Sequence, residues 1–269
     1  MKQNCLRMIV AGLVFLSFNI IAVGQKTVVP IVDLVNKGLL GGVQNGRWLK
    51  AEAVAPKMKA ETEFTLVGWK GVEEGGVTQG KKSETEGACP DFQRFKFELE
   101  MQSGVALGSN AGWNPMPRPL KEIGLTDKTY SGVVADFLKT KGITKTTIKI
   151  AQSFRVDLDA DGREEVVLSA TFYKKKDGDS SQRGDYSFVL VRKIVKGKAQ
   201  NLLLVGDIIT KITGDEPPNE YQISAIADLN GDGRMEIVVA SSYYEGDSAG
   251  VYEIKANKFV KVLENDCGV

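Results

Sequence analysis

Two acidic stretches with the same pattern constrain the fold of this chain more than any other feature. They read DLDADGREEVVL, from Asp157 to Leu168, and DLNGDGRMEIVV, from Asp228 to Val239. In both, carboxylate or amide side chains occupy positions one, three and five, glycine occupies position six, and an apolar run follows. Glycine permits a sharp turn, and alternate side chains of such a curled loop converge on one point. The pattern predicts a loop that leads directly into a β-strand.

Converging oxygen atoms are the ligands that calcium requires, since this hard cation takes about six to eight of them. A glutamate at position nine can close the site from the start of the next strand, and position seven offers its backbone carbonyl. The sequence therefore predicts two calcium sites with a structural role. The expected ligands of the first are Asp157, Asp159, Asp161, the carbonyl of Arg163, and Glu165; those of the second are Asp228, Asn230, Asp232, the carbonyl of Arg234, and Glu236.

Neither stretch is half of an EF-hand. That loop needs a closing glutamate at position twelve and a helix on each side, whereas position twelve is Leu168 in one copy and Val239 in the other. The flanks alternate and are rich in β-branched residues, so they predict strands. The remaining alternative is an acidic β-turn without metal, because Asp, Asn and Gly favour turns for local reasons. Two copies in the same register favour calcium.

The two stretches resemble the D-x-[DN]-x-D-G-x-x-[DE] loops of FG-GAP and VCBS-type repeats, which occur in integrin-like β-propellers and in exported bacterial proteins. The resemblance covers the chain from about Thr146 onward and implies calcium held between the first two strands of a propeller blade. Both copies depart from the commonest pattern at position nine, which is Glu165 or Glu236 rather than aspartate. We expect a mainly β fold, an antiparallel β-propeller-like structure, small or irregular, with one short helix. The alternative is a β-rich domain that carries two such loops.

The spacing of the loops agrees with this expectation. The interval between Asp157 and Asp228 contains four segments with strand-like patterns. Four antiparallel strands make one propeller blade. We therefore expect residues 146–269 to form a β-repeat region with two calcium loops, and residues 25–145 to form a separate β-rich region.

The pattern of residues 25–145 is less regular. Its first part, to about residue 60, suits either a strand or a short helix over residues 30–37. Strands are expected at 61–69 and 92–101, with a polar, glycine-rich segment over 72–91 that is either a long loop or a hairpin tip. One helix is expected in TDKTYSGVVADFLKTKGI, residues 126–143. Its apolar stripe is Val133, Val134, Phe137 and Leu138, and Gly142 follows as a natural helix end.

Residues 1–24 have the features of a secretory signal peptide. Lys2 and Arg7 precede the apolar run 8–23, and small residues around Gly24 offer a cleavage site. The alternative, a membrane anchor, needs about 20 apolar residues, which is longer than this run. We expect cleavage after Gly24, no stable membrane span afterwards, and a secreted or periplasmic protein.

Composition removes several classes of function. The chain has no histidine, which excludes histidine-based catalytic triads and histidine zinc sites. Its 35 basic residues nearly balance its 34 acidic ones, so charge gives no reason to expect nucleic acid as a partner. Outside the signal segment only Cys89 and Cys267 remain, and they form either a disulfide or two buried free thiols.

These features predict an exported, calcium-binding, non-catalytic protein with a structural or binding role. Its partner is expected to be a protein or a glycan, neither identified by the sequence. The alternative is a secreted hydrolase or lyase that acts on polysaccharide with a pair of carboxyl groups.

Overall fold

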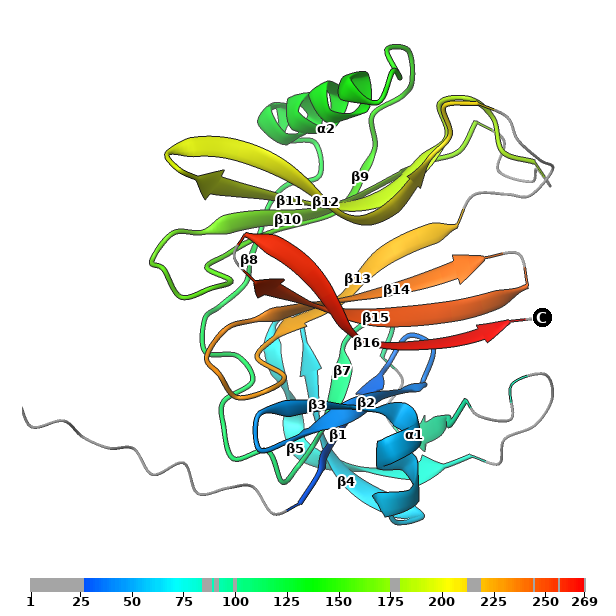
Figure 1. Cartoon of the computed structure of the whole chain (residues 1–269), viewed down its shortest axis with the longest axis vertical. Helices are drawn as coiled ribbons and strands as arrows, with labels where there is room; N and C mark the ends of the chain where they lie inside the picture. Colours follow the sequence, from blue (N-terminus) through cyan, green and yellow to red (C-terminus); the bar gives the residue numbers. More distant parts are fainter. Residues whose placement is uncertain are drawn as a thin grey trace, which may run out of the picture.

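The structure is a stack of three antiparallel β-sheets with a helix at one end (Figure 1). It is a computed structural model of the whole chain and describes residues 27–83, 89, 92–98, 101–174, 180–211, 219–243, 245–255 and 257–268. The expected signal peptide, residues 1–24, lies outside the described residues. Within them, no helix combines the length and the apolar character needed to cross a membrane.

The first layer is a seven-stranded sheet in the order β3-β2-β1-β7-β4-β5-β6. Its strands are β1 (Val29–Asp33), β2 (Leu39–Gln44), β3 (Arg47–Lys50), β4 (Glu61–Gly68), β5 (Gly71–Lys82), β6 (Phe95–Phe97) and β7 (Val105–Gly108). After β3 come a four-residue helix, α1 (Ala51–Val54), and a 3₁₀ turn, η1 (Ala55–Lys57). The first segment is thus a strand rather than a helix, and the structure has a second short helix that the sequence pattern does not indicate.

Strand β4 confirms the strand expected at 61–69. Strand β5 shows that residues 72–82 of the expected loop or hairpin tip form a strand instead, while most of residues 83–91 lie outside the described residues. Glycine-rich β5 is held by backbone pairing with β4 on one side and β6 on the other. A Cβ on Gly80 would lie 2.6 Å from the ring of Phe64 and 2.8 Å from that of Phe97. The glycine therefore makes room for aromatic rings on neighbouring strands, a tertiary reason that local composition does not reveal. Strand β6 is also shorter than the expected 92–101.

The other two layers are built from consecutive antiparallel strands. The five-stranded sheet contains β8 (Lys121–Glu122), β9 (Ile150–Val156), β10 (Glu165–Phe172), β11 (Tyr186–Val195) and β12 (Lys198–Ile208), in the order β12-β11-β10-β9-β8. The four-stranded sheet contains β13 (Glu220–Ala227), β14 (Glu236–Tyr243), β15 (Gly246–Lys255) and β16 (Lys258–Gly268). Four strands, β10 to β13, lie between the two acidic loops, as expected. Each loop joins the first two strands of a four-stranded meander.

The four-stranded sheet is the middle layer and is buried on both faces. Along β14, Ile237 and Val239 pack toward the five-stranded sheet, while Val238 and Ala240 pack toward the seven-stranded sheet. This alternation follows from the two-residue period of a strand. Each fully buried Ile or Val side chain contributes about 1.5–3 kcal/mol, so the two interfaces hold the stack together.

Helix α2 (Lys128–Thr140) covers the outer face of the five-stranded sheet (Figure 1). The carboxylate of Asp127 caps its first turn by accepting from the amides of Thr129 and Tyr130. Phe137 packs edge-to-face on Phe188 of β11, with ring centroids 5.2 Å apart. The helix, its buried stripe and its end before Gly142 are confirmed.

Adjacent sheets pack face to face, as propeller blades do, but within the described residues the three sheets do not close into a ring. The fold is therefore mainly antiparallel β, and the propeller-like description stays a prediction. Helix α2 and strand β8 precede residue 146 in the sequence, yet both pack with the five-stranded sheet that follows.

A disulfide joins Cys89 to Cys267 in β16, with a Cα–Cα distance of 5.6 Å. Of the two alternatives for these cysteines, the structure has the disulfide. Its partners are 178 residues apart, so it ties the last strand of the middle layer to the loop after β5. Such a bond stabilises mainly by restricting the unfolded chain.

Asp33 is a buried carboxyl at the junction of the seven-stranded and four-stranded sheets. It accepts from the hydroxyl of Ser224 at 2.5 Å and from the amide of Asn36 at 2.8 Å. Burial raises the pKa of Asp33, and these hydrogen bonds, which lower it, do not compensate. The neutral carboxyl is therefore favoured in the folded protein relative to the unfolded chain.

We expect Asp33→Asn to weaken the pH dependence of stability. A carboxyl with a raised folded-state pKa stabilises fully below its unfolded pKa of 3.8, and that contribution is lost as the pH rises through the folded pKa. The amide does not titrate, and the Ser224 hydroxyl can turn to the Gly104 carbonyl, 3.0 Å away. Urea unfolding between about pH 4 and pH 8 measures the difference. Equal pH slopes for the wild type and the variant would contradict the assignment.

Candidate metal centre

The two acidic loops lie side by side in the structure. The first, residues 157–164, joins β9 to β10, and the second, residues 228–235, joins β13 to β14. The amide of Met235 donates to the carbonyl of Leu158 at 2.8 Å, which links one loop directly to the other. Because β9–β10 and β13–β14 belong to neighbouring sheets, this contact lies at the end of the interface between those sheets.

Position one organises the backbone of each loop. The Asp157 carboxylate accepts from the amides of Asp161 at 3.2 Å and Gly162 at 3.0 Å. In the second loop, the Asp228 carboxylate accepts from the amides of Gly231 at 2.7 Å and Gly233 at 2.9 Å. These contacts wrap the backbone around the first aspartate, as the sequence pattern predicts.

Position nine closes each loop in the same way. Glu165 accepts from the amide of Leu158 at 3.0 Å, and Glu236 accepts from the amide of Leu229 at 2.8 Å. Both glutamates therefore reach back from the start of the next strand to position two of their loop. The common register inferred from sequence is confirmed by these equivalent contacts.

Position seven contributes a backbone amide in both loops. Arg163 donates it to Asp161 at 2.9 Å, and Arg234 donates it to Asp232 at 2.8 Å. Both arginine side chains are exposed. The ligand role expected of the two arginine carbonyls stays a prediction.

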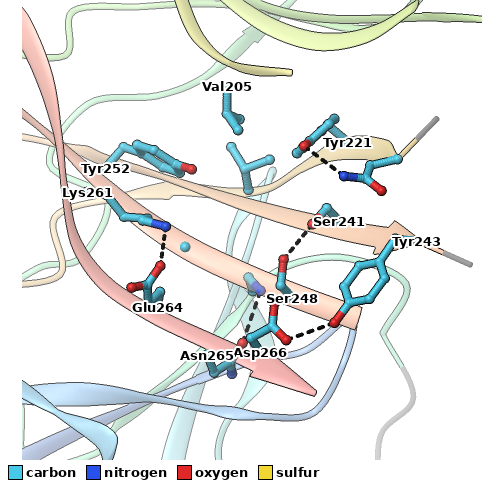
Figure 2. A pocket seen from close by; sticks show the side chains of 14 residues that line it. Val205, Tyr221, Ser241, Tyr243, Ser248, Tyr252, Lys261, Glu264, Asn265 and Asp266 are labelled. Atoms are coloured by element: carbon cyan, nitrogen blue, oxygen red, sulfur yellow. Dashed lines mark hydrogen bonds and ion pairs between the residues drawn. The ribbon is translucent and has the colours of Figure 1, made fainter. Parts of the chain in front are cut away.

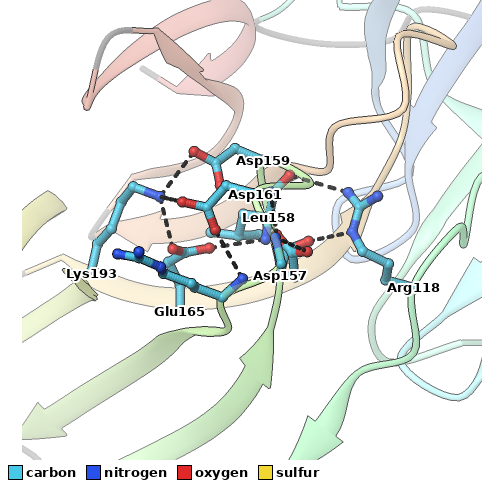
Figure 3. Close-up of polar contacts among 9 residues, drawn as sticks. Arg118, Asp157, Leu158, Asp159, Asp161, Glu165 and Lys193 are labelled. Atoms are coloured by element: carbon cyan, nitrogen blue, oxygen red, sulfur yellow. Dashed lines mark hydrogen bonds and ion pairs between the residues drawn. The ribbon is translucent and has the colours of Figure 1, made fainter. Parts of the chain in front are cut away.

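The first loop gathers three carboxylates that could hold a metal ion, Asp157, Asp159 and Glu165. However, the ammonium group of Lys193 from β11 lies against two of them (Figure 3). Its Nζ is 2.8 Å from Glu165 and 2.9 Å from Asp159, and the lysine side chain is only 3% exposed. The ammonium therefore already pairs with two of the three carboxylates that a metal ion would use.

The lysine and its partners are electrostatically coupled. Burial alone would lower the pKa of Lys193, but its hydrogen bonds to Glu165 and Asp159 outweigh burial and raise the pKa. Burial raises the pKa of Glu165, and the contact with Lys193 opposes that rise. The buried lysine is therefore charged and acts as a counterion to the loop.

The second loop has no such counterion. Among the ion pairs of the described residues, none involves Asp228, Asp232 or Glu236. Glu236 is 1% exposed, and its Oε1 has no hydrogen-bond partner. Burial, together with Asp232 and Asp228, raises the pKa of Glu236 to about 9.

The second loop has the oxygen donors that a hard cation prefers, although among the described residues only the first loop brings three carboxylates within 4.8 Å of one another. Asp228 and Asn230 are buried, like Glu236, and the side chains of these three residues and of Asp232 all offer oxygen. A buried carboxylate oxygen without a donor costs free energy unless a charge compensates it. A divalent cation bound by Asp228, Asn230, Asp232 and Glu236 would supply that charge.

The sequence reasoning missed the groups that hold the loops from outside. Trp113 donates its indole N–H to the carbonyl of Asp228 at 2.9 Å, and Pro115 accepts from the Asp228 amide at 2.8 Å. The guanidinium of Arg118 donates to the carbonyls of Asp157 and Leu158. The irregular segment 109–120 thus braces both loops, and its sequence carries no signal of that role.

Lys193 was also missed, although the sequence does contain a signal for it. It belongs to the apolar strand β11 and shares a face with Val189 and Val191, which are fully buried. A lysine on the buried face of a strand needs a carboxylate partner. Finding that partner requires the pairing of β10 with β11.

A small cavity lies between the five-stranded and four-stranded sheets, away from the loops (Figure 2). Its volume is about 210 Å³. Three tyrosines line it: Tyr221, Tyr243 and Tyr252. The hydroxyl of Tyr243 donates to Asp266 at 2.8 Å. The cavity therefore combines aromatic surface with polar groups.

No family model matches the chain, and neither the curated proteins nor the solved structures provide a match. The case for a function therefore rests on the geometry described above.

The sixth-position glycines give a direct test of the loop conformation. Gly162 and Gly233 have φ values of +81° and +82°, and an added Cβ would meet no atom within 4 Å at either position. We expect Gly162→Ala and Gly233→Ala each to cost about 1–2 kcal/mol of unfolding free energy, from backbone strain alone. Urea unfolding measures this cost.

Gly132 is the matched control, because it lies inside helix α2 and an added Cβ there also meets nothing. Gly132→Ala should stabilise by about 0.5–1 kcal/mol. Loop variants that are as stable as the wild type would mean that the loops do not adopt this conformation.

Proposed function

We propose that this chain is an exported, non-catalytic binding protein that is stabilised by calcium in its second acidic loop, and that it belongs with the FG-GAP and VCBS-type repeat proteins. The observation that carries the proposal is the buried Glu236 oxygen without a donor, in a loop whose Asp228, Asn230 and Asp232 side chains supply further oxygen atoms. Export is supported by the signal-like segment 1–24 and by the Cys89–Cys267 disulfide, since disulfides persist in oxidising compartments.

Calcium suits the second loop better than other common metals. Its candidate ligands are carboxylate, amide and carbonyl oxygens, without nitrogen or sulfur, which disfavours zinc and copper. Magnesium demands near-ideal octahedral geometry and keeps several waters, whereas calcium accepts flexible, oxygen-rich loops. Compartments outside the cytoplasm also supply calcium at millimolar levels.

The position of the loop supports a structural role for the ion. The loop joins the first two strands of the middle sheet, and the segment around Trp113 and Pro115 is fastened to it. Its Met235 amide also reaches the first loop. An ion there would hold the ends of two sheets and the connecting segment in one arrangement.

The binding role is assigned to the tyrosine-lined cavity. Tyrosines offer a flat apolar ring and a polar tip, which suits groups that are partly apolar and partly polar. A cavity of about 210 Å³ admits one small group, such as a single sugar ring or one side chain of a protein partner. Its two carboxylates, Glu264 and Asp266, are bound to Lys261 and Tyr243, and we assign them to ligand contact rather than to polysaccharide cleavage.

Calcium should raise the melting temperature of the chain without residues 1–24. At a free calcium concentration 100 times the Kd, binding stabilises by about 2.7 kcal/mol. For a chain of this size that amounts to about 5–10 °C. Differential scanning calorimetry in excess calcium and in excess chelator measures the shift. Asp228→Asn should abolish most of it.

Glu236→Gln should abolish the shift as well, yet it should not destabilise the chelated protein at neutral pH, because the Glu236 carboxyl, with its pKa raised to about 9, is already neutral there and the amide has a similar shape. A wild-type melting temperature that does not respond to calcium would overturn the proposed function.

A further inference from the structure

We propose that Lys193 is a built-in counterion that replaces the metal in the first loop, so that the chain binds a single divalent cation, in the second loop. Each acidic loop belongs to a four-strand unit, β9 to β12 for the first loop and β13 to β16 for the second. One position on the third strand of the unit decides between ammonium and metal. That position is Lys193 on β11 and Glu253 on β15. The inference rests on the proposed calcium site of the second loop and adds which loop binds and why.

Strand register shows that the two positions are equivalent. The pairing of β10 with β11 places Val166 opposite Arg192, so one step further Glu165 faces Lys193. The pairing of β14 with β15 places Ile237 opposite Tyr252, so one step further Glu236 faces Glu253. The residue opposite the position-nine glutamate is therefore Lys193 in the first unit and Glu253 in the second, at equivalent positions of the third strand.

In the first unit that neighbour is a lysine that pairs with the acids of the loop. Lys193 contacts Glu165 at 2.8 Å and Asp159 at 2.9 Å, and it lies 4.0 Å from Asp161 (Figure 3). Calcium would need these same oxygens at about 2.3–2.6 Å. The ammonium and the metal ion therefore compete for one place. Asp159 keeps Oδ1 without a partner, but its side chain is 19% exposed and its other oxygen is bonded to Lys193.

In the second unit the neighbour is an acid. Glu253 accepts from the indole N–H of Trp48 at 3.3 Å and pairs with Lys255 at 3.0 Å. The Lys255 side chain is 57% exposed, so this lysine lies at the surface and leaves Glu236 without a counterion. The unpaired oxygen of Glu236, a residue only 1% exposed, is an observation independent of the acidic cluster, and a bound cation would give that oxygen a partner.

The two units therefore differ in their dependence on calcium. The cation of the first loop is a side chain of the same protein, Lys193, so this loop keeps its conformation at any calcium concentration. The second loop must recruit its cation from solution. The two loops share one sequence pattern, yet a chelator would disturb the conformation of the second loop only.

Isothermal titration with calcium chloride tests the inference on the chain without residues 1–24. The wild type should bind one calcium ion, and Asp228→Asn, but not Asp157→Asn, should abolish binding. Lys193→Glu copies the second unit, and it should raise the number of bound ions from one to two. It should also lower the melting temperature in chelator and regain it in calcium. Lys193→Gln is a milder variant with the same expected direction.

The reciprocal exchange does not require removing Lys193. Glu253→Lys places an ammonium opposite Glu236 and should weaken calcium binding at least tenfold. Glu253→Gln is its matched control, because it removes the same carboxylate without adding a cation, and it should keep the site.

The outcomes separate the two proposals. A wild type that binds no calcium overturns the proposed function. A wild type that binds two ions, or one ion lost through Asp157→Asn, overturns the counterion assignment alone. If both Lys193 variants fail to fold even in calcium, the Glu253 pair decides: full binding by Glu253→Lys overturns the inference, and loss of binding in that variant alone supports it.

Discussion

The middle sheet of this protein is buried on both faces, and the rest of the structure depends on that constraint. Its apolar side chains alternate between two interfaces, so polar groups at those interfaces must find partners within the protein. Gln152 of the five-stranded sheet meets this requirement by pairing with both the amide and the carbonyl of Ile223. Asp33 of the seven-stranded sheet does so through Ser224. The polar contacts thus fix how each outer sheet sits on the middle one.

The acidic loops solve the same problem at the ends of the sheets. A sharp strand-to-strand connection leaves backbone amides without sheet partners, and a first-position aspartate collects them. Asp157 and Asp228 each bind two amides of their own loop. Collecting amides with carboxylates concentrates acidic groups in each loop. In the first loop the ammonium of Lys193 pairs with two of them, and in the second loop burial and the neighbouring acids raise the pKa of Glu236 to about 9.

The sequence predicts best those features whose causes are local. The loops and helix α2 are predictable because glycine, aspartate and a helical apolar stripe act within a few residues. The seven-stranded sheet is not, because β1 pairs with β7 although β2 to β6 all lie between them in the chain. Glycine-rich β5 is a strand only because neighbouring strands pair with it. The partner of Lys193, Glu165, cannot be predicted for the same reason, since the two residues are neighbours only through the pairing of β10 with β11.

The acidic loop motif therefore predicts the conformation of the loop, but it does not by itself predict whether the loop binds a metal ion. The two loops share their amide contacts at positions two, six and seven, yet one faces Lys193 and the other faces Glu253. Because a strand side chain can supply either an ammonium or a carboxylate to the same place, the residue opposite position nine decides whether the loop's charge is neutralised from within. On the proposal that Lys193 replaces the metal ion of the first loop, an acidic loop with a lysine at that position would bind no ion. The sequence of the neighbouring strand, aligned by the pairing of the two strands, would then distinguish the two kinds of loop.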